Sequence, residues 1–127
     1  MAVQRKVLLV EDDDSMRSAL ERLLVAHQFN CSAFTSAEAL LALGGGEAAS
    51  CVVSDLRLPA MSGLDLADAM RAQGGWPPLI LITAHDTPGL EAEARRRGAA
   101  GYLPKPFRGT VLIDTIKQLT ETPGAHH

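Results

Sequence analysis

The sequence predicts an α/β fold in which helices cover both faces of a doubly wound, five-stranded parallel sheet. First, short apolar runs and amphipathic helical patterns alternate five times along the 127 residues. Alternation of this kind is typical of β-α units joined by right-handed crossovers. Second, the apolar runs are short and continuous, as in strands buried on both faces. Third, four of the runs are followed by acids, a hydroxyl or an ammonium, at the point where parallel strands end.

The first unit is a strand over Val7–Val10 and a helix over Ser15–His27. The strand is an apolar run that ends in a series of acids. The helix carries apolar residues at helical spacing, and Asp14 or Ser15 can cap its start. The apolar positions of this helix are Met16, Ala19, Leu20, Leu23 and Leu24.

The second unit is a strand over Phe29–Phe34 and a helix over Ser36–Leu43. Ser36 has the side chain of a helix cap. The glycines at positions 44–46 are typical of a helix stop and predict a loop after the helix.

The third strand is predicted over Cys51–Ser54 and ends at Asp55. A helix over Leu64–Ala72 follows it. The fourth strand, Leu79–Ile82, is entered through Pro77-Pro78, which cannot continue a helix.

The last two predicted helices come before and after the fifth strand in the sequence. Thr87-Pro88 resembles a cap with a first-turn proline, so we expect a helix from there to Arg97, before a glycine. Gly101–Leu103 is predicted as a short strand, and Thr110–Leu119 as the last helix. The expected core residues of that helix include Val111, Ile113 and Ile116.

The bulk composition narrows the class of protein. The net charge of −3 gives no overall basic surface for nucleic acid. No apolar run could span a bilayer and no signal peptide precedes the first strand, so we expect a cytoplasmic protein without a membrane partner. Cys31 and Cys51 lack metal-ligand spacing and are interpreted as reduced and structural. We interpret residues 1–121 as one domain and residues 122–127 as a linker or tag remnant.

Polar side chains follow four of the predicted strands. The first strand is followed by the acids of residues 11–14, the third by Asp55, the fourth by Thr83 and the fifth by Lys105. Ligands of an open parallel sheet bind outside the carboxyl ends of its strands. We therefore expect these side chains to form one site.

Several carboxylates at one edge would repel each other and raise each other's pKa values. A divalent cation relieves this repulsion, and ligands that are all oxygen select a hard ion such as Mg²⁺. Carboxylates also act as nucleophiles that form an aspartyl phosphate. A cation, an ammonium, a hydroxyl and a free carboxylate together predict a site for a phosphoryl group.

Four segments resemble the receiver domains of two-component response regulators, above all the FixJ-like subgroup of transcriptional regulators. The resemblance runs from Lys6 to about Leu119. Each segment is weak alone, but the four occur in the right order at the right strand ends. The segments are Val10-Glu11-Asp12-Asp13 with Arg17, Asp55 to Gly63, Ile82-Thr83-Ala84-His85, and Tyr102 to Phe107.

The resemblance implies a fold and a set of residue roles. The fold would be flavodoxin-like and CheY-like, with strand order 2-1-3-4-5. Asp55 would accept the phosphoryl group. Asp12 would be a direct ligand of Mg²⁺, with Mn²⁺ as a substitute, and Glu11 would help to hold the ion. Asp55 and the backbone carbonyl of Arg57 would complete the protein's share of the coordination.

Further roles follow from the same resemblance. Thr83 would donate its hydroxyl to a phosphoryl oxygen, and Lys105 would pair with Asp55 before phosphorylation and with phosphate afterwards. The Lys105–Pro106 peptide bond would be cis. Ala84 would leave room for the phosphoryl donor. Tyr102 would be the aromatic that rotates inward as Thr83 moves; a fixed surface aromatic is the alternative.

One position departs from the family pattern. Glu11 stands where Asp is commoner, and its longer side chain would weaken or reposition the metal. Arg57 and His85 flank the site at positions that vary across the family, where they would influence hydrolysis of the acyl phosphate.

The resemblance also implies a function and partners. The domain would take its phosphoryl group from a cognate histidine kinase and would catalyse its own phosphorylation and dephosphorylation, without turning over an external substrate. The surface of the fourth helix and fifth strand would then change. It would control a partner, a homodimer, or a C-terminal DNA-binding output domain that is not in this chain, most simply in transcription.

Three other functions are alternatives for a chain with this pattern. A phosphatase of the haloacid dehalogenase type needs a second Asp two residues after the nucleophile, where this chain has Arg57. A flavodoxin-like cofactor binder needs a phosphate loop after the first strand, where this chain has four acids. A receiver-like scaffold that is never phosphorylated would not need the complete residue set, although Glu11 leaves room for it.

Overall fold

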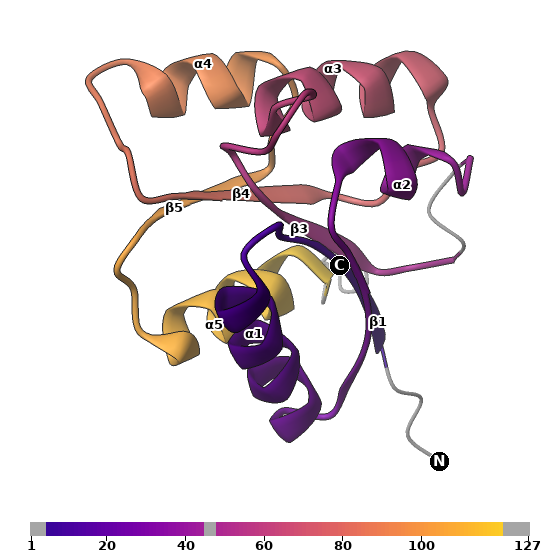
Figure 1. The fold of residues 1–127 in the computed structure, drawn as a ribbon, viewed down its shortest axis with the longest axis vertical. Coiled ribbons are helices and arrows are strands. Elements are labelled where there is room, and N and C mark those ends of the chain that lie inside the picture. Colours follow the sequence, from indigo (N-terminus) through magenta and orange to yellow (C-terminus); the bar gives the residue numbers. More distant parts are fainter. Residues whose placement is uncertain (1–4, 45–47, 121–127) are drawn as a thin grey trace, which may run out of the picture.

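The computed structural model describes residues 5–44 and 48–120 and contains five strands and five helices in strict alternation within them (Figure 1). Their order along the chain agrees with the predicted one. The elements are β1 (Arg5–Val10), α1 (Asp14–Ala26), β2 (Phe29–Phe34), α2 (Ala37–Leu41), β3 (Cys51–Asp55), α3 (Gly63–Gln73), β4 (Leu79–Thr83), α4 (Leu90–Arg96), β5 (Gly101–Pro104) and α5 (Gly109–Thr120).

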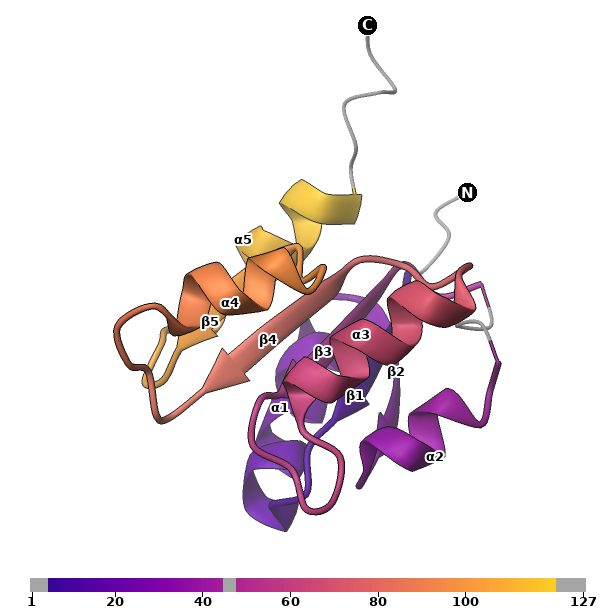
Figure 2. The ribbon, with the colours of Figure 1, turned by 90° about the horizontal axis from the view of Figure 1, so that it is seen from above.

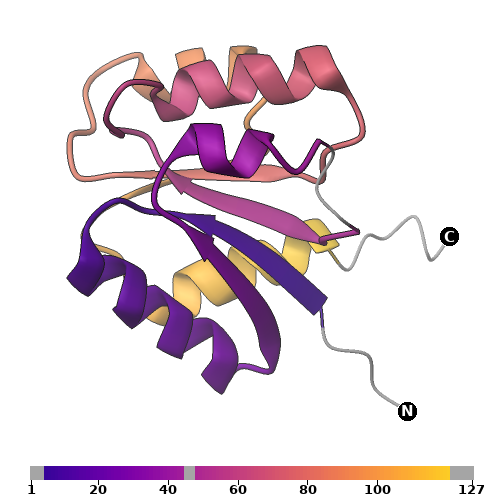
Figure 3. The same ribbon diagram turned by 45° about the vertical axis from the view of Figure 1, so that its right-hand side comes forward.

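The strands form one parallel sheet in the order β2-β1-β3-β4-β5, which confirms the predicted fold class. Helices α1 and α5 cover one face, and α2, α3 and α4 cover the other (Figures 1 and 3). Seen from above the second face, α3 and α4 lie over the middle and the β5 side of the sheet (Figure 2). Because all five strands run parallel, their carboxyl ends lie at one edge of the sheet.

Two apolar cores hold these layers together, one on each face of the sheet. Along β1 the side chains alternate between them: Val7 and Leu9 join the core under α1 and α5, while Leu8 and Val10 join the core under α2, α3 and α4. This alternation is the two-residue period of a strand. Because both faces are covered, β1 is apolar at each of these positions.

Helix α1 begins one residue earlier than predicted. The predicted caps, Asp14 and Ser15, are wrong: Asp13 is the N-cap, and its carboxylate accepts from the amide of Met16 at 2.7 Å. In the same helix Ala19 is exposed rather than apolar core. The caps of α2 and α3 are Ser36 and Ser62, of which the first was predicted.

Helix α4 begins later than predicted. Thr87-Pro88 does not open it; the helix starts at Leu90 after Gly89, which has a φ of 84° and offers no side-chain cap. The last helix also differs in one core position, because Val111 is 41% exposed and Leu112 is buried instead.

The remaining sequence predictions concern loops, cysteines and the membrane. Helix α2 ends at Leu41, earlier than predicted; positions 45 and 46 of the predicted glycine stop, and the predicted linker at 122–127, lie outside the described residues. Cys31 and Cys51 are free thiols, the first half-buried and the second buried. Within the described part of the chain, no helix combines the length and apolar character needed to cross a membrane.

Candidate functional site

Polar side chains at the ends of four strands lie at the carboxyl edge of the sheet. Asp55 and Thr83 are the last residues of β3 and β4, Glu11 directly follows β1, and Lys105 directly follows β5. The register pairs Asp55 with Ile82 and places β3 between β1 and β4. The parallel topology therefore gathers the side chains that the sequence predicts for the site.

Three carboxylates meet at this edge and are called the acidic cluster: Glu11, Asp12 and Asp55. One oxygen of each lies within 4.8 Å of the others. Glu11 is 1% exposed and Asp55 9% exposed, whereas Asp12 is open to solvent. No group among the residues that the structure describes donates a hydrogen bond to the buried Oε1 of Glu11. Buried acceptors normally have a partner, so this cluster suits a hard cation bound through oxygen.

The electrostatics of the acidic cluster agree with this interpretation. Burial raises the pKa of Glu11, and the charges of Asp55 and Asp12 raise it further, against the Asp13 amide and Lys105. Burial also raises the pKa of Asp55, while Lys105 and the amides of Arg57 and Leu56 act in the opposite direction. Burial, more than the neighbouring charges, therefore makes the charged forms of Glu11 and Asp55 unfavourable.

Lys105 is the cation of the site. Its Nζ lies 3.5 Å from Glu11 Oε1 and 3.9 Å from Asp55 Oδ1, so it sits between the two acids and is nearer to Glu11. The amide of Lys105 donates to the carbonyl of Thr83 at 2.6 Å, which fixes its backbone to the end of β4. The peptide bond between Lys105 and Pro106 is cis.

Thr83 supplies the hydroxyl of the site and is fully buried. Its Oγ1 accepts from the amide of His85 at 3.0 Å. A hydroxyl has two acceptor positions and one hydrogen. The bond to His85 therefore leaves the hydrogen of Thr83 for another acceptor, such as a phosphoryl oxygen.

The backbone on either side of Asp55 is held tightly. The amide of Leu56 donates to the carbonyl of Ile82 at 2.8 Å, and the amide of Gly63 donates to the carbonyl of Leu56 at 2.7 Å. A Cβ on Gly63 would lie 2.8 Å from both the Asp55 carbonyl oxygen and Leu56 Cα. The start of α3 can pack under the site only because this residue is glycine.

Arg57 and Ala84 follow the strand ends and are both exposed. Ala60 lies with Arg57 in the connection between β3 and α3 and adopts a φ of 62°. This left-handed conformation is unfavourable for a residue with a Cβ.

Tyr102 lies on β5 and is buried, 6% exposed, so a surface aromatic is the wrong description. Its hydroxyl donates to Asp86 Oδ1 at 2.6 Å. Burial raises the pKa of Tyr102, and the Asp86 carboxylate adds to this effect. The contact joins β5 to the connection between β4 and α4, directly beyond Thr83.

Sequence reasoning did not find the contacts that three residues make around the site. Asp is a preferred N-cap residue, and Asp13 lies three residues before Met16, whose amide it accepts from. This signal could have identified Asp13 as the cap of α1 from the sequence. The contact of Asp86 with Tyr102 has no signal in the local sequence. The contact between Arg17 and the Glu11 carbonyl, 3.0 Å long, also depends on how the strand enters the helix.

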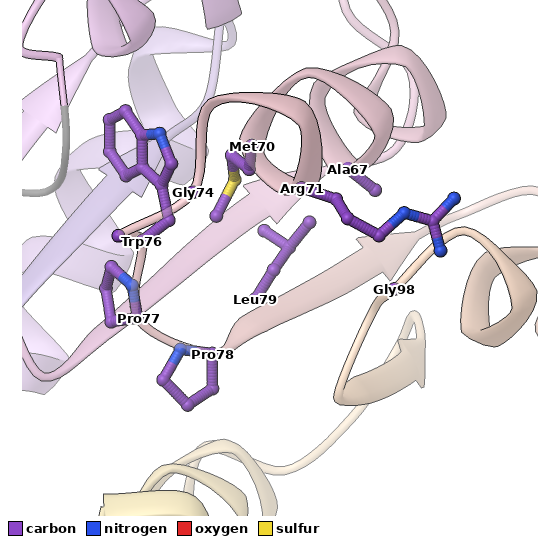
Figure 4. A pocket seen from close by; sticks show the side chains of 10 residues that line it. Ala67, Met70, Arg71, Gly74, Trp76, Pro77, Pro78, Leu79 and Gly98 are labelled. Atoms are coloured by element: carbon purple, nitrogen blue, oxygen red, sulfur yellow. The ribbon is translucent and has the colours of Figure 1, made fainter.

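A groove of about 370 Å³ lies at the other end of β4 (Figure 4). It runs between the end of α3 and Leu79, where β4 begins, whereas the acidic cluster lies where β4 ends. Trp76, Pro77 and Pro78 line one side of it, and Arg71 reaches toward Gly98 on another. It is therefore separate from the site at the carboxyl edge.

Comparison with known proteins gives a family for this arrangement. The profile of the response regulator receiver domain matches residues 7–117. The chain is 40% identical over 122 residues to the response regulator protein FleR of Pseudomonas aeruginosa, covering 94% of this chain and 26% of FleR. It is 35% identical over 124 residues to the transcriptional regulatory protein FixJ of Bradyrhizobium diazoefficiens, covering 95% of this chain and 60% of FixJ.

Solved structures agree with the sequence relatives. The crystal structure of FixJ-N superposes with a TM-score of 0.84 at 32% identity, covering 94% of this chain and 96% of that one. The chemotaxis protein CheY4 of Vibrio cholerae gives a TM-score of 0.82 at 26% identity, covering 92% and 99% of the two chains.

The curated relatives are longer than this chain. It spans about a quarter of FleR and three fifths of FixJ, as the shares of 26% and 60% indicate. The match nevertheless extends over nearly all of the described residues, from β1 to α5. Because the match has this extent and the solved structures share the fold, the chain belongs to the receiver domain family of two-component response regulators and is related to transcriptional regulators.

Proposed function

We propose that this receiver domain accepts a phosphoryl group on Asp55 from the phosphohistidine of a histidine kinase, in a reaction that requires Mg²⁺. One observation carries the proposal: Asp55 lies within an acidic cluster that also faces Lys105 and the Thr83 strand end. Glu11 and Asp12 would hold the ion together with Asp55 and the carbonyl of Arg57, and Mn²⁺ would substitute for Mg²⁺.

The transfer is a nucleophilic displacement at phosphorus. A carboxylate oxygen of Asp55 forms the new bond to phosphorus, while the bond from phosphorus to the donor nitrogen breaks. The donor imidazole leaves with that electron pair, and the product is an acyl phosphate. When bound, Mg²⁺ neutralises charge on the phosphoryl oxygens. Lys105 adds a second positive charge, and the Thr83 hydroxyl donates to a phosphoryl oxygen.

Dephosphorylation would use the same residues. A water oxygen attacks phosphorus, the bond to the Asp55 oxygen breaks, and inorganic phosphate leaves the free carboxylate behind. The domain in this scheme catalyses changes in its own modification and converts no external substrate. Arg57 and His85 would influence the rate of this hydrolysis.

Phosphorylation would act as a switch through the connection between β4 and α4. It adds nearly two negative charges and three acceptors at one carboxylate. Thr83 and Lys105 would gain contacts that exist only in the phosphorylated state, and such differential contacts shift a conformational equilibrium. The readout would be the surface of α4 and β5, because Asp86 and Tyr102 join the connection to β5.

We propose that this surface controls a partner, a second copy of the domain or a DNA-binding output domain. The relatives FleR and FixJ are longer than this chain and are named as a response regulator and a transcriptional regulator. This kinship supports a histidine kinase and an output domain as the proposed partners.

The central test is direct phosphorylation. The protein is incubated with Mg²⁺ and acetyl phosphate, and its intact mass is measured. We expect the mass to rise by one phosphoryl group in the wild type and to stay unchanged in Asp55→Asn. EDTA should abolish the gain and Mn²⁺ should restore it. Equal labelling of Asp55→Asn, or labelling unaffected by EDTA, would sink the proposal.

A second test addresses the switch. Beryllofluoride with Mg²⁺ mimics the phosphoryl group, and two-dimensional NMR reports the response of each amide. We expect shifts in α4, β5 and the connection between β4 and α4. Shifts confined to the immediate surroundings of Asp55 would contradict the proposed readout surface.

A further inference from the structure

The loop that carries the two acids of the first strand end is held by an arginine on the helix that follows. Arg17 lies in the second turn of α1 and its side chain is only 20% exposed. Its Nη1 donates to the backbone carbonyl of Glu11 at 3.0 Å, and its Nη2 donates to Asp14 Oδ1 at 2.6 Å. One guanidinium thus bridges the strand end and the first residue of the helix.

The other contacts of this loop make Glu11 its centre. The amide of Glu11 donates to the carbonyl of Phe34 on β2 at 3.0 Å, and Glu11 Oε2 accepts from the amide of Asp13 at 3.2 Å. With its carbonyl held by Arg17, Glu11 uses three of its polar groups to fix the loop. Only Oε1 remains, and it faces the Nζ of Lys105 at 3.5 Å.

We infer that Arg17 is a positioning residue for the divalent cation at the acidic cluster, acting through the backbone of Glu11 and Asp12. This inference rests on the proposed function, because it concerns the same ion. A guanidinium is a rigid planar fork and can hold two acceptors at a fixed separation, which an ammonium on a flexible stem cannot do. Without the fork, the carbonyl of Glu11 can turn, and the carboxylates of residues 11 and 12 lose their common direction.

Charge and geometry predict opposite effects at this position. A positive charge near a cation site opposes the binding of the cation. If Arg17 acted only as a charge, Arg17→Gln would therefore bind Mg²⁺ more tightly and Arg17→Lys would leave the affinity unchanged. If Arg17 positions the loop, both variants bind Mg²⁺ more weakly.

The matched control is Arg22→Gln on the same helix. Arg22 is exposed, and its Nη1 donates to Ser18 Oγ at 3.2 Å, away from the acidic loop. This variant removes the same charge and leaves the contacts of Glu11 in place. Asp14→Asn is a second control, which removes the charge of the other acceptor while Arg17 keeps its bond to the Glu11 carbonyl.

The experiment is a titration of each purified, metal-free protein with Mg²⁺ in a calorimeter, together with the Tm in EDTA. We expect the Kd for Mg²⁺ to rise about tenfold in Arg17→Gln and Arg17→Lys, the lower end of the effect of outer residues on metal affinity. Arg22→Gln should keep the wild-type Kd. The rate of labelling by acetyl phosphate should fall at limiting Mg²⁺ and return to the wild-type rate at saturating Mg²⁺.

Three outcomes would overturn the inference alone, and a fourth would overturn the proposed function. Tighter binding in Arg17→Gln with unchanged binding in Arg17→Lys would assign Arg17 a charge effect alone. A lower Tm in EDTA with an unchanged Kd would assign it a structural role only. If the wild type binds no Mg²⁺, the proposed function itself fails; if the wild type binds and all variants bind equally, the inference alone fails.

Discussion

Two regions of the molecule are rich in charged side chains, and they differ in almost every physical respect. The acidic cluster lies at the carboxyl edge of the sheet, largely buried, with Lys105 as its nearby cation. The second region, which we call the α3–α4 network, lies between the two helices and is partly exposed. It consists of Asp65, Asp68, Arg71, Glu93, Arg96 and Arg97.

In the α3–α4 network every acid meets an arginine. Arg97 binds Glu93 and Asp68, each at 2.8 Å, and Arg71 donates to the carbonyl of Arg96 at 3.1 Å. Arg96 also pairs with Glu93. These bonds tie the end of α4 to α3, and they lower the pKa of Glu93 through the side chains of Arg97 and Arg96.

The comparison teaches that acid content alone does not mark a functional site. The pKa of Glu93 is lowered by its partners, whereas burial raises the pKa values of Glu11 and Asp55. A balanced set of charges contributes to packing between helices. An unbalanced and buried set costs stability in the absence of a ligand, and perturbed groups of this kind gather at functional sites.

The largest expected effect tests whether the acidic cluster depends on tight backbone packing. In Gly63→Ala the new Cβ would lie 2.8 Å from the Asp55 carbonyl oxygen and from Leu56 Cα, neither of which can move freely. We expect a loss of about 3 kcal/mol in the free energy of unfolding, measured with urea. Gly109→Ala is the control, because its Cβ would meet only the mobile end of Leu23 at 2.9 Å. An equal loss in both variants would contradict the prediction.

The next effect tests the electrostatic cost of the acidic cluster. In EDTA, Asp55→Asn should raise the free energy of unfolding by about 1 to 3 kcal/mol, because a buried and poorly compensated charge is removed. A raised pKa in the folded state means that the wild type loses stability as pH rises through that pKa. The advantage of Asp55→Asn should therefore grow as the pH rises from the ordinary pKa of an aspartate through the raised pKa of Asp55 in the folded protein.

Mg²⁺ should reduce or reverse this difference, because the ion binds and stabilises only the wild-type carboxylate site. Asp68→Asn in the α3–α4 network is the matched control and should not gain stability at any pH, since Asp68 already pairs with Arg97. An unchanged or lower stability of Asp55→Asn in EDTA at neutral pH would show that the cluster is not under electrostatic strain.

A smaller effect concerns backbone strain beside Asp55. Ala60 adopts a φ of 62°, so Ala60→Gly should stabilise the fold by about 0.5 to 1 kcal/mol in thermal or urea unfolding. Gln28→Gly, at a φ of 66° between α1 and β2, is the comparison away from the site. If both variants gain stability, a positive φ is unfavourable wherever it occurs in this backbone. If neither variant gains stability, the prediction of strain is wrong.

The smallest effect is expected in the α3–α4 network. Arg97→Gln removes contacts to Glu93 and Asp68, but partly exposed ion pairs contribute little. We expect the Tm to fall by at most a few degrees, and the difference to vanish in high salt because mobile ions screen such pairs. Arg22→Gln, which loses a contact to Ser18 instead, should leave the Tm unchanged. A large loss that persists in high salt would make the network as important as the core.

The sequence alone determined the order of the elements, the parallel sheet and the edge at which the site lies. The alternation of apolar runs and helical patterns implies βα units, and in a parallel sheet all carboxyl ends lie together. The residues after each strand could therefore be assigned to one place without knowing any distance. Glu11, Asp55, Thr83 and Lys105 are found together for this reason.

The tertiary structure decided the contacts within that place. The packing of β1, β3 and β5 decides which acid lies nearer to Lys105. It also decides that Glu11 Oε1 is buried without a hydrogen bond from any described residue. The exact start of α4 and the bond of Tyr102 to Asp86 likewise depend on residues far apart in sequence. The spacing of apolar residues in the sequence predicts whether a segment is a helix or a strand. The distances between side chains of different elements are set only when those elements pack together.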